Sequence, residues 1–124
     1  MTDTNTLFLY VSDAAASARL YTALLGIEPV EASPTFALFI LPSGLALGLW
    51  RKDGVDPRPV AGGGGSELGF RVSTPAEVDD IHADWRARGT TIALPPTDLD
   101  FGRSFVALDP EGHRLRVYWV AEEM

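Results

Sequence analysis

The sequence contains no cysteine and only two histidines among its 124 residues. The absence of cysteine excludes a disulfide scaffold, thiolate zinc sites, iron–sulfur clusters and a cysteine nucleophile. With so few histidines, any metal site would need carboxylates or an amide to complete its set of ligands. Metal chemistry is therefore restricted to unusual ligand sets from the outset.

Basic residues are also scarce, because ten Lys and Arg stand against seventeen Asp and Glu, giving a net charge of −7 and an isoelectric point near 4.6. Such a surface repels phosphate backbones and anionic membranes, so neither nucleic acid nor a membrane is an expected partner. The uncharged run of 19 residues at 32–50 is divided by Pro34 and by the turn at 42–44 into pieces typical of strands. The first five residues lack the features of a signal peptide, which predicts a cytoplasmic location.

What is present is the composition of an ordinary globular domain, with 46% hydrophobic and 22% charged residues. A chain of this size can bury a core without covalent cross-links, so we expect a single domain over residues 1–124. Within it the chain repeats itself. Residues 7–12 and 68–73 are each a short apolar strand that ends in Val-Ser before a helix, and Gly26 and Gly89 close those helices.

The two helices carry recognisable ends. The first begins at Ser12 or Asp13 and stops at Gly26. The second begins with a capping box, in which Thr74 caps the helix and Glu77 lies three residues later. After each helix the pattern predicts three strands, at 28–32, 35–41 and 45–51 and again at 91–94, 101–108 and 114–120. The prediction is an α+β fold of two βαβββ modules, 6–51 and 66–121, joined by a glycine-rich linker at 52–65.

This doubled pattern resembles the vicinal oxygen chelate superfamily, which includes glyoxalase and bleomycin-resistance proteins. The motifs that carry the resemblance are Ser12-Asp13, Ser17, Tyr21, Leu24-Leu25-Gly26 and Asp109-Pro110-Glu111-Gly112. Three stretches, 42–47, 66–69 and 98–103, are most similar to the phenazine antibiotic resistance proteins, which bind a planar tricyclic antibiotic without a metal. The resemblance implies a cleft of curved mixed sheet with the helices on its outer face, usually in a homodimer.

In the metal-dependent members of that superfamily, ligands come from four strand positions, which here hold Thr6, Gly48, Glu67 and Arg116. Glycine offers no side chain, and a guanidinium would repel a divalent cation. Glu67 is the one plausible ligand, so no metal and no cofactor are expected. His82, on the second helix, and His113, after a turn glycine, are expected to be structural.

Side chains alternate between the two faces of a strand, and the four family positions indicate which face lines the cleft. The predicted ligand-binding residues are Phe8, Tyr10, Phe39, Gly48, Trp50, Glu67, Arg71, Arg103, Phe105, Arg116 and Tyr118. Aromatic rings stack on planar ligands, an arginine fork binds a carboxylate, and a glycine lets a flat ligand approach the backbone. The resulting hypothesis is a non-catalytic, metal-independent protein that sequesters a planar aromatic, anionic small molecule, such as a phenazine antibiotic.

Two alternatives remain open at this point. In the first, Phe8, Tyr10 and Trp50 form the core of a dimer interface, and Glu67 simply pairs with an arginine, either Arg116 or Arg71. In the second, the protein is a lyase or isomerase of glyoxalase type with a degenerate metal site, and Glu67 acts as a general base.

Overall fold

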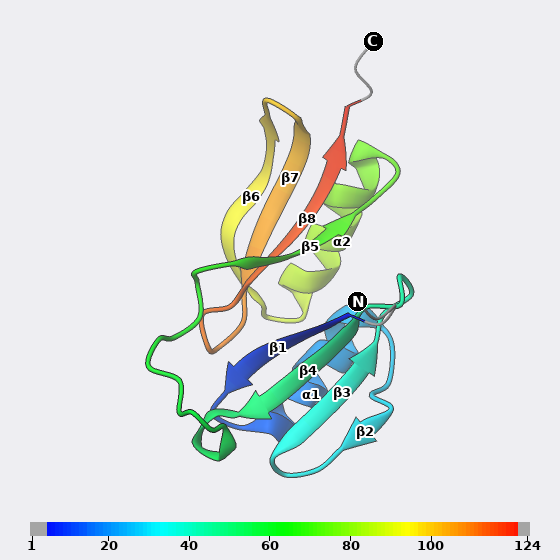
Figure 1. Cartoon of the computed structure of the whole chain (residues 1–124). Helices are drawn as coiled ribbons and strands as arrows, with labels where there is room; N and C mark the ends of the chain where they lie inside the picture. Colours follow the sequence, from blue (N-terminus) through cyan, green and yellow to red (C-terminus); the bar gives the residue numbers. More distant parts are fainter. Residues whose placement is uncertain (1–4, 122–124) are drawn as a thin grey trace. The chain divides into compact units, whose positions relative to one another are not determined.

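The structure is a computed structural model that describes residues 5–121. It consists of two compact units, which divide between Gly62 and Gly63. Each unit has the same order of elements, a strand, a helix and three further strands (Figure 1). The predicted α+β fold of two βαβββ modules is confirmed.

The first module contains a four-stranded mixed sheet in the order β1-β4-β3-β2. Strands β1 and β4 are parallel, and the other neighbours are antiparallel. Its elements are β1 (Thr6–Val11), α1 (Ala14–Leu25), β2 (Glu31–Ala32), β3 (Phe36–Ile40) and β4 (Ala46–Arg51), followed by a short 3₁₀ turn, η1 (Lys52–Gly54).

The second module repeats this topology with the order β5-β8-β7-β6, in which β5 and β8 are parallel. Its elements are β5 (Glu67–Arg71), α2 (Pro75–Ala87), β6 (Thr91–Leu99), β7 (Gly102–Leu108) and β8 (Arg114–Val120). No described helix in either module is long and apolar enough to cross a membrane.

The ends of the helices are set by local capping interactions. The Asp13 side chain accepts a hydrogen bond from the Ala16 N–H at 3.0 Å, and Gly26 ends α1 in the left-handed conformation at φ +71°. At the start of α2 the Thr74 hydroxyl accepts from the Glu77 N–H, while the Glu77 carboxylate accepts from the Thr74 N–H at 3.0 Å. The predicted capping box is therefore confirmed.

Two strands differ from their predicted lengths by three residues or more. β6 runs to Leu99 rather than Leu94, although it contains Pro95 and Pro96. It is an edge strand, and its ladder with β7 skips from Leu94 to Thr97, so the prolines lie where no inter-strand bond is required. In the first module β2 is shorter than predicted, with only two residues.

Each helix covers one face of its own sheet, as Figure 1 shows for α1 and for α2. The buried residues of the first module include Val11, Ala14, Tyr21, Leu24, Phe39, Leu47 and Leu49, and those of the second include Val78, Trp85, Phe105, Ala107, Leu115 and Val117. The opposite face of each sheet carries no helix of its own module within residues 5–121. We call these two surfaces the open faces, and the predicted ligand-binding residues are traced onto them below.

Candidate functional site

The open face of the first module is defined by the strand registers. Phe8 lies opposite Gly48 in the β1–β4 ladder, and Tyr10 lies opposite Trp50. Residues directly opposite each other in a ladder point to the same face, so these four share one surface. Their neighbours along the strands point the other way, toward the face of the sheet that α1 covers. The structure therefore brings together Phe8, Tyr10, Gly48 and Trp50, as predicted for the first module.

Three aromatic rings form a cluster on this face. The ring of Phe8 lies 5.6 Å from that of Trp50 and 6.4 Å from that of Phe36, and the Phe36 and Trp50 rings are 6.2 Å apart and edge to face. They line an open pocket of about 380 Å³. Phe8 is nevertheless 46% exposed, which is unusual for a ring of this size. We call Phe8, Phe36 and Trp50 the aromatic pocket.

The absence of a side chain at Gly48 leaves room for the Phe8 ring to lie against the sheet. A Cβ atom at this position would come within 2.7 Å of the Phe8 ring and 3.1 Å of the Phe36 ring, closer than side-chain atoms normally approach. The lack of a side chain at Gly48 therefore sets the depth of the aromatic pocket.

The open face of the second module is polar and is organised around Glu67. Arg116 donates to both carboxylate oxygens, from Nε at 2.7 Å and from Nη2 at 3.0 Å, and Arg114 Nε donates at 2.8 Å. Arg116 also donates from Nη1 to the Ser104 hydroxyl at 2.8 Å. Strand β5 supplies the acid, β8 the two arginines and β7 the serine, so the cluster links three neighbouring strands.

These contacts change the acidity of Glu67. Hydrogen bonds from Arg116, and then from Arg114, lower the pKa of the carboxyl from 4.5 to about 2, although partial burial acts in the opposite direction. The carboxylate therefore stays ionised throughout the physiological range. A group with so low a pKa is a weak general base, because efficient bases have pKa values near the working pH. This geometry does not favour a lyase or isomerase that depends on Glu67.

Beyond this cluster, the same face carries Tyr118 and Arg71. The two residues lie opposite each other in the parallel β5–β8 ladder. The Tyr118 ring lies over Gly69, where a Cβ would come within 3.2 Å of it, and Phe101 meets that ring edge to face at 6.2 Å. The side chain of Arg71 is exposed and makes no hydrogen bond or ion pair within residues 5–121.

Three of the predicted ligand-binding residues are on the wrong face of their sheets. Phe39 and Phe105 are fully buried on the helix sides, and Phe105 packs edge to face with Trp85 of α2 at 5.5 Å. Arg103 lies opposite Trp119 on that same side. The prediction was shifted by one residue in strands β3 and β7, and such a shift moves every side chain to the other face.

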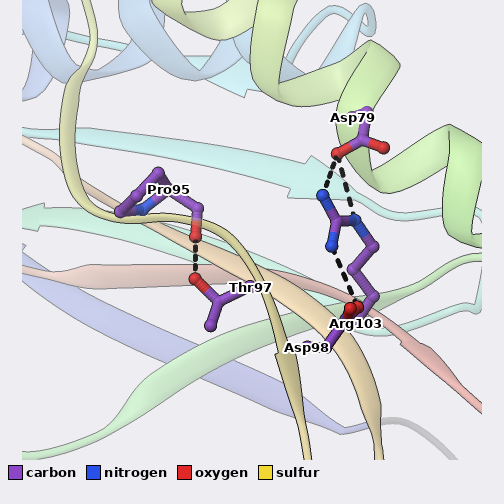
Figure 2. A network of polar contacts seen from close by, with 5 residues as sticks. All are labelled: Asp79, Pro95, Thr97, Asp98 and Arg103. Atoms are coloured by element: carbon purple, nitrogen blue, oxygen red, sulfur yellow. Dashed lines mark hydrogen bonds and ion pairs between the residues drawn. The ribbon is translucent and has the colours of Figure 1, made fainter.

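Figure 2 shows what Arg103 does instead. Its guanidinium donates to Asp79 of α2 at 3.0 and 3.1 Å and to Asp98 of β6 at 2.9 Å. Near it the Thr97 hydroxyl donates to the Pro95 carbonyl at 2.6 Å, within the irregular part of β6. Arg103 therefore joins the helix to the edge of the sheet and contributes nothing to the open face.

Phe36 and Ser104 lie on the open faces but were not predicted from the sequence, although the pairing of strands around each turn indicates both. The Leu41 N–H donates to the Leu45 carbonyl across the β3–β4 turn, and counting five residues outward on each side places Phe36 opposite Trp50. The same count from the second turn places Ser104 opposite Tyr118. Pairing outward from each turn would have corrected the phase of both strands.

The four metal positions of the superfamily do not fit a metal ion in this chain. Gly48 has no donor atom, Arg116 is a cation, and the Glu67 carboxylate is held by two guanidiniums. Binding a cation at Glu67 would require displacing both arginines from it. Within the described residues, no group of three His, Cys, Asp or Glu side chains could hold a metal ion.

The two histidines lie apart from the open faces. His82 is half-buried on α2 with its ring 5.3 Å from the Phe105 ring, so it lies at the boundary of the core. The backbone N–H of His113 donates to the Asp109 carboxylate at 2.8 Å, so this residue belongs to the turn before β8.

The repeated βαβββ modules, with one aromatic and one arginine-rich open face, define a member of the glyoxalase-type folds. Among its metal positions, Gly48 and Arg116 cannot ligate, and the Glu67 carboxylate is held by two arginines. The model of the Glyoxalase/Bleomycin resistance protein/Dioxygenase superfamily matches residues 4–117, and the chain belongs to this superfamily. The resemblance inferred from the motifs is confirmed.

Individual relatives extend this comparison. The phenazine antibiotic resistance protein EhpR of Enterobacter agglomerans is 30% identical over 119 residues, which cover 91% of this chain and 88% of EhpR. A protein of Agrobacterium tumefaciens, solved by NMR in solution, is 47% identical with a TM-score of 0.85, covering 98% of this chain and all of that one. A glyoxalase/bleomycin resistance protein/dioxygenase from Nocardioides is 28% identical with a TM-score of 0.84, covering 100% and 87%.

Proposed function

We propose that this protein binds a planar aromatic, anionic small molecule of phenazine type without transforming it, and that it confers tolerance by sequestering that molecule. The observation that carries the proposal is the aromatic pocket of Phe8, Phe36 and Trp50, which stays open on the sheet although its rings are large and apolar. Offset or edge-to-face contacts with such rings favour flat aromatic ligands over globular ones.

Two further observations support a binding role. The relative EhpR is a phenazine antibiotic resistance protein, and the identity extends over most of both chains. The positions that hold a metal in catalytic members of the superfamily carry Gly48 and Arg116, and Glu67 is a weak base.

Trp50 provides a direct test, because it is the tryptophan of the aromatic pocket. Of the other two, Trp85 is buried against the sheet and Trp119 lies on the helix side of β8. Titration with phenazine-1-carboxylate is expected to quench the fluorescence saturably in the wild type and in Trp119→Phe, and to lose that signal in Trp50→Phe. No saturable change up to several hundred micromolar ligand would overturn the proposal.

The ligand recovered after incubation separates binding from catalysis. A binding protein returns phenazine-1-carboxylate chemically unchanged, with one equivalent bound per site, and chromatography with mass detection measures both quantities. A new product that accumulates beyond one equivalent would contradict a purely binding role. It would instead restore the alternative of a lyase or isomerase.

In the other alternative, the aromatic residues are buried in an interface between two copies of the chain. This alternative makes a different prediction. Sedimentation of the wild type and of Phe8→Ala without ligand tests it. A homodimer is expected for both proteins if the aromatic pocket is a ligand site, because the dimer would not depend on Phe8. Dissociation of Phe8→Ala to a 13.4 kDa species would assign this face to the interface instead.

A further inference from the structure

The aromatic pocket is lined by rings that face in different directions. They belong to three neighbouring strands, with Phe8 on β1, Trp50 on β4 and Phe36 on β3. The Phe8 ring is tilted by 60° to that of Trp50 and by 49° to that of Phe36, and the remaining pair stands at 83°. Each ring therefore forms a separate wall of the pocket. An extended fused ring system can contact more of these walls at once than a shorter one can.

The position of the Phe8 ring depends on the residue opposite it. In the parallel ladder of β1 and β4, Phe8 is the register partner of Gly48. A Cβ atom at position 48 would lie 2.7 Å and 3.0 Å from two carbon atoms of the Phe8 ring, and 3.1 Å from a carbon atom of the Phe36 ring. The two rings therefore already fill the space over Gly48 that a flat ligand would need in order to approach the backbone there.

The Phe8 ring has room to move outward, because 46% of its surface is exposed. A methyl group at position 48 would require the ring to retreat by about 0.7 Å, from 2.7 Å to the 3.4 Å at which ordinary contacts begin. The obstacle is the end of a side chain that can yield into solvent, and no backbone atom of another residue is among the three nearest atoms. A side chain at position 48 should therefore change the shape of the aromatic pocket more than the stability of the fold.

We propose that Gly48 is a positioning residue, which keeps the Phe8 ring in place as one wall of the aromatic pocket and thereby makes the protein prefer extended fused rings to shorter ones. Gly48 acts on the ligand only through Phe8 and does not contact the ligand itself. The residues concerned all belong to the first module. This inference rests on the proposed function, since it names the residue that decides which aromatic molecules the same pocket selects.

Two carboxylates that differ by one fused ring test the inference, phenazine-1-carboxylate and the shorter quinoxaline-5-carboxylate. Calorimetric titration of the wild type is expected to show about tenfold or greater preference for the phenazine, because the additional ring buries more apolar surface. Gly48→Ala should lower the affinity for the phenazine about three- to tenfold and reduce the preference, while its urea unfolding stays close to that of the wild type.

Gly54→Ala is the matched control. A Cβ atom at this position would lie 3.9 Å from Nε1 of Trp50, which is an ordinary contact beside the same pocket. Because no ring has to move, this variant should keep both the affinity and the preference within about twofold. An effect as large as that of Gly48→Ala would contradict the inference.

A double-mutant cycle shows whether Gly48 acts through Phe8. In the Phe8→Ala background, Gly48→Ala should cause no further loss of the preference, because the ring that it displaces has already been removed. Equal losses in the two backgrounds would mean that the ligand contacts position 48 directly, which would overturn the inference.

The outcomes separate the inference from the proposed function. If the wild type binds neither carboxylate, the proposed function fails. If it binds the two equally, or if Gly48→Ala and Phe8→Ala keep the preference for the phenazine, the inference fails and the proposed function stands. An unfolded Gly48→Ala would also overturn the inference, because the Phe8 ring would then be unable to give way. In that case the titration of Phe8→Ala still tests the proposed function.

Discussion

Arg116 forms a two-bond fork with Glu67, in which Nε donates to Oε1 at 2.7 Å and Nη2 donates to Oε2 at 3.0 Å. Of the two partners considered for Glu67 from the sequence, Arg116 makes this contact, and Arg71 does not. A position that supplies a metal ligand in catalytic relatives here supplies the cation that neutralises a neighbouring carboxylate. The presence of an arginine at this position should affect the stability of the protein and the way that stability depends on pH.

Removing Arg116 should destabilise the fold even without ligand. Arg116→Ala leaves Glu67 with Arg114 alone and leaves the buried Ser104 hydroxyl without its guanidinium. We expect a loss of about 1–3 kcal/mol in the free energy of unfolding, measured by urea denaturation. The exposed and unpaired Arg71 provides the control, and Arg71→Ala should change stability by no more than about 0.5 kcal/mol. Equal effects of the two substitutions would contradict the structural role of Arg116.

The fork also makes stability depend on pH. The pKa of Glu67 is about 2 in the folded protein and near 4.5 when unperturbed. A lowered pKa in the folded state stabilises the protein fully above pH 4.5, and this contribution is lost as the pH falls from about 4.5 to about 2. Its size is at most about 3 kcal/mol. Glu67→Gln should therefore be less stable than the wild type at pH 6 and should approach it near pH 2.5, as followed by urea unfolding at each pH. A difference that stays constant between these pH values would rule out the ionised pair as its source.

Gly102 cannot accept a side chain. It has a φ of +153°, and a Cβ at this position would collide with the backbone carbonyl of Trp119 on the neighbouring strand. Because backbone cannot move aside as a flexible side chain can, Gly102→Ala should cost at least about 2 kcal/mol of unfolding free energy. Gly62→Ala is the matched control, since nothing lies within 4 Å of the added atom. Thermal and chemical denaturation of both variants would measure the difference, and similar stabilities would contradict the collision.

Removing the capping box of α2 should have a smaller effect on stability than the substitution of Gly102. Thr74→Ala removes the hydroxyl that accepts from the Glu77 N–H, and a loss of about 1 kcal/mol is expected. The adjacent Ser73 contributes only its backbone N–H to Glu77, so Ser73→Ala should be nearly neutral. Chemical denaturation of the two variants tests the assignment, which would be wrong if Ser73→Ala proved the more destabilising.

The substitution Arg103→Ala should lower the stability of the fold only slightly and should leave the affinity for the ligand unchanged. The partners of Arg103, Asp79 and Asp98, are 50% and 83% exposed, so solvent screens its ion pairs and they contribute little to stability. Because the side chain points to the α2 side, Arg103→Ala should bind phenazine-1-carboxylate as the wild type does, within about twofold by calorimetry. A large loss of affinity with normal stability would place Arg103 in the binding site after all.

Much of the architecture was predictable from the sequence because its causes are local. The caps of both helices depend on residues within four positions of each other, as at Asp13 and at Thr74, and the repeat is visible as two copies of one pattern. The open-face residues of the first and last strands, such as Phe8, Trp50 and Tyr118, followed from alternation with a period of two, once the four strand positions implied by the superfamily resemblance had indicated which face is open.

Only the tertiary structure decided the phase of the third strands and the partners of the arginines. In β3 the residues 36–40 are all apolar, so alternation cannot tell Phe36 from Phe39, and the choice is made by pairing with β4. In β7, Arg103 resembles a cleft residue until α2 brings Asp79, 24 positions earlier in the chain, within hydrogen-bonding distance. Likewise, nothing in the sequence distinguishes Arg71 from Arg114 and Arg116. They differ because a parallel ladder sets Glu67 beside two of them, 47 and 49 positions away, and leaves the third unengaged.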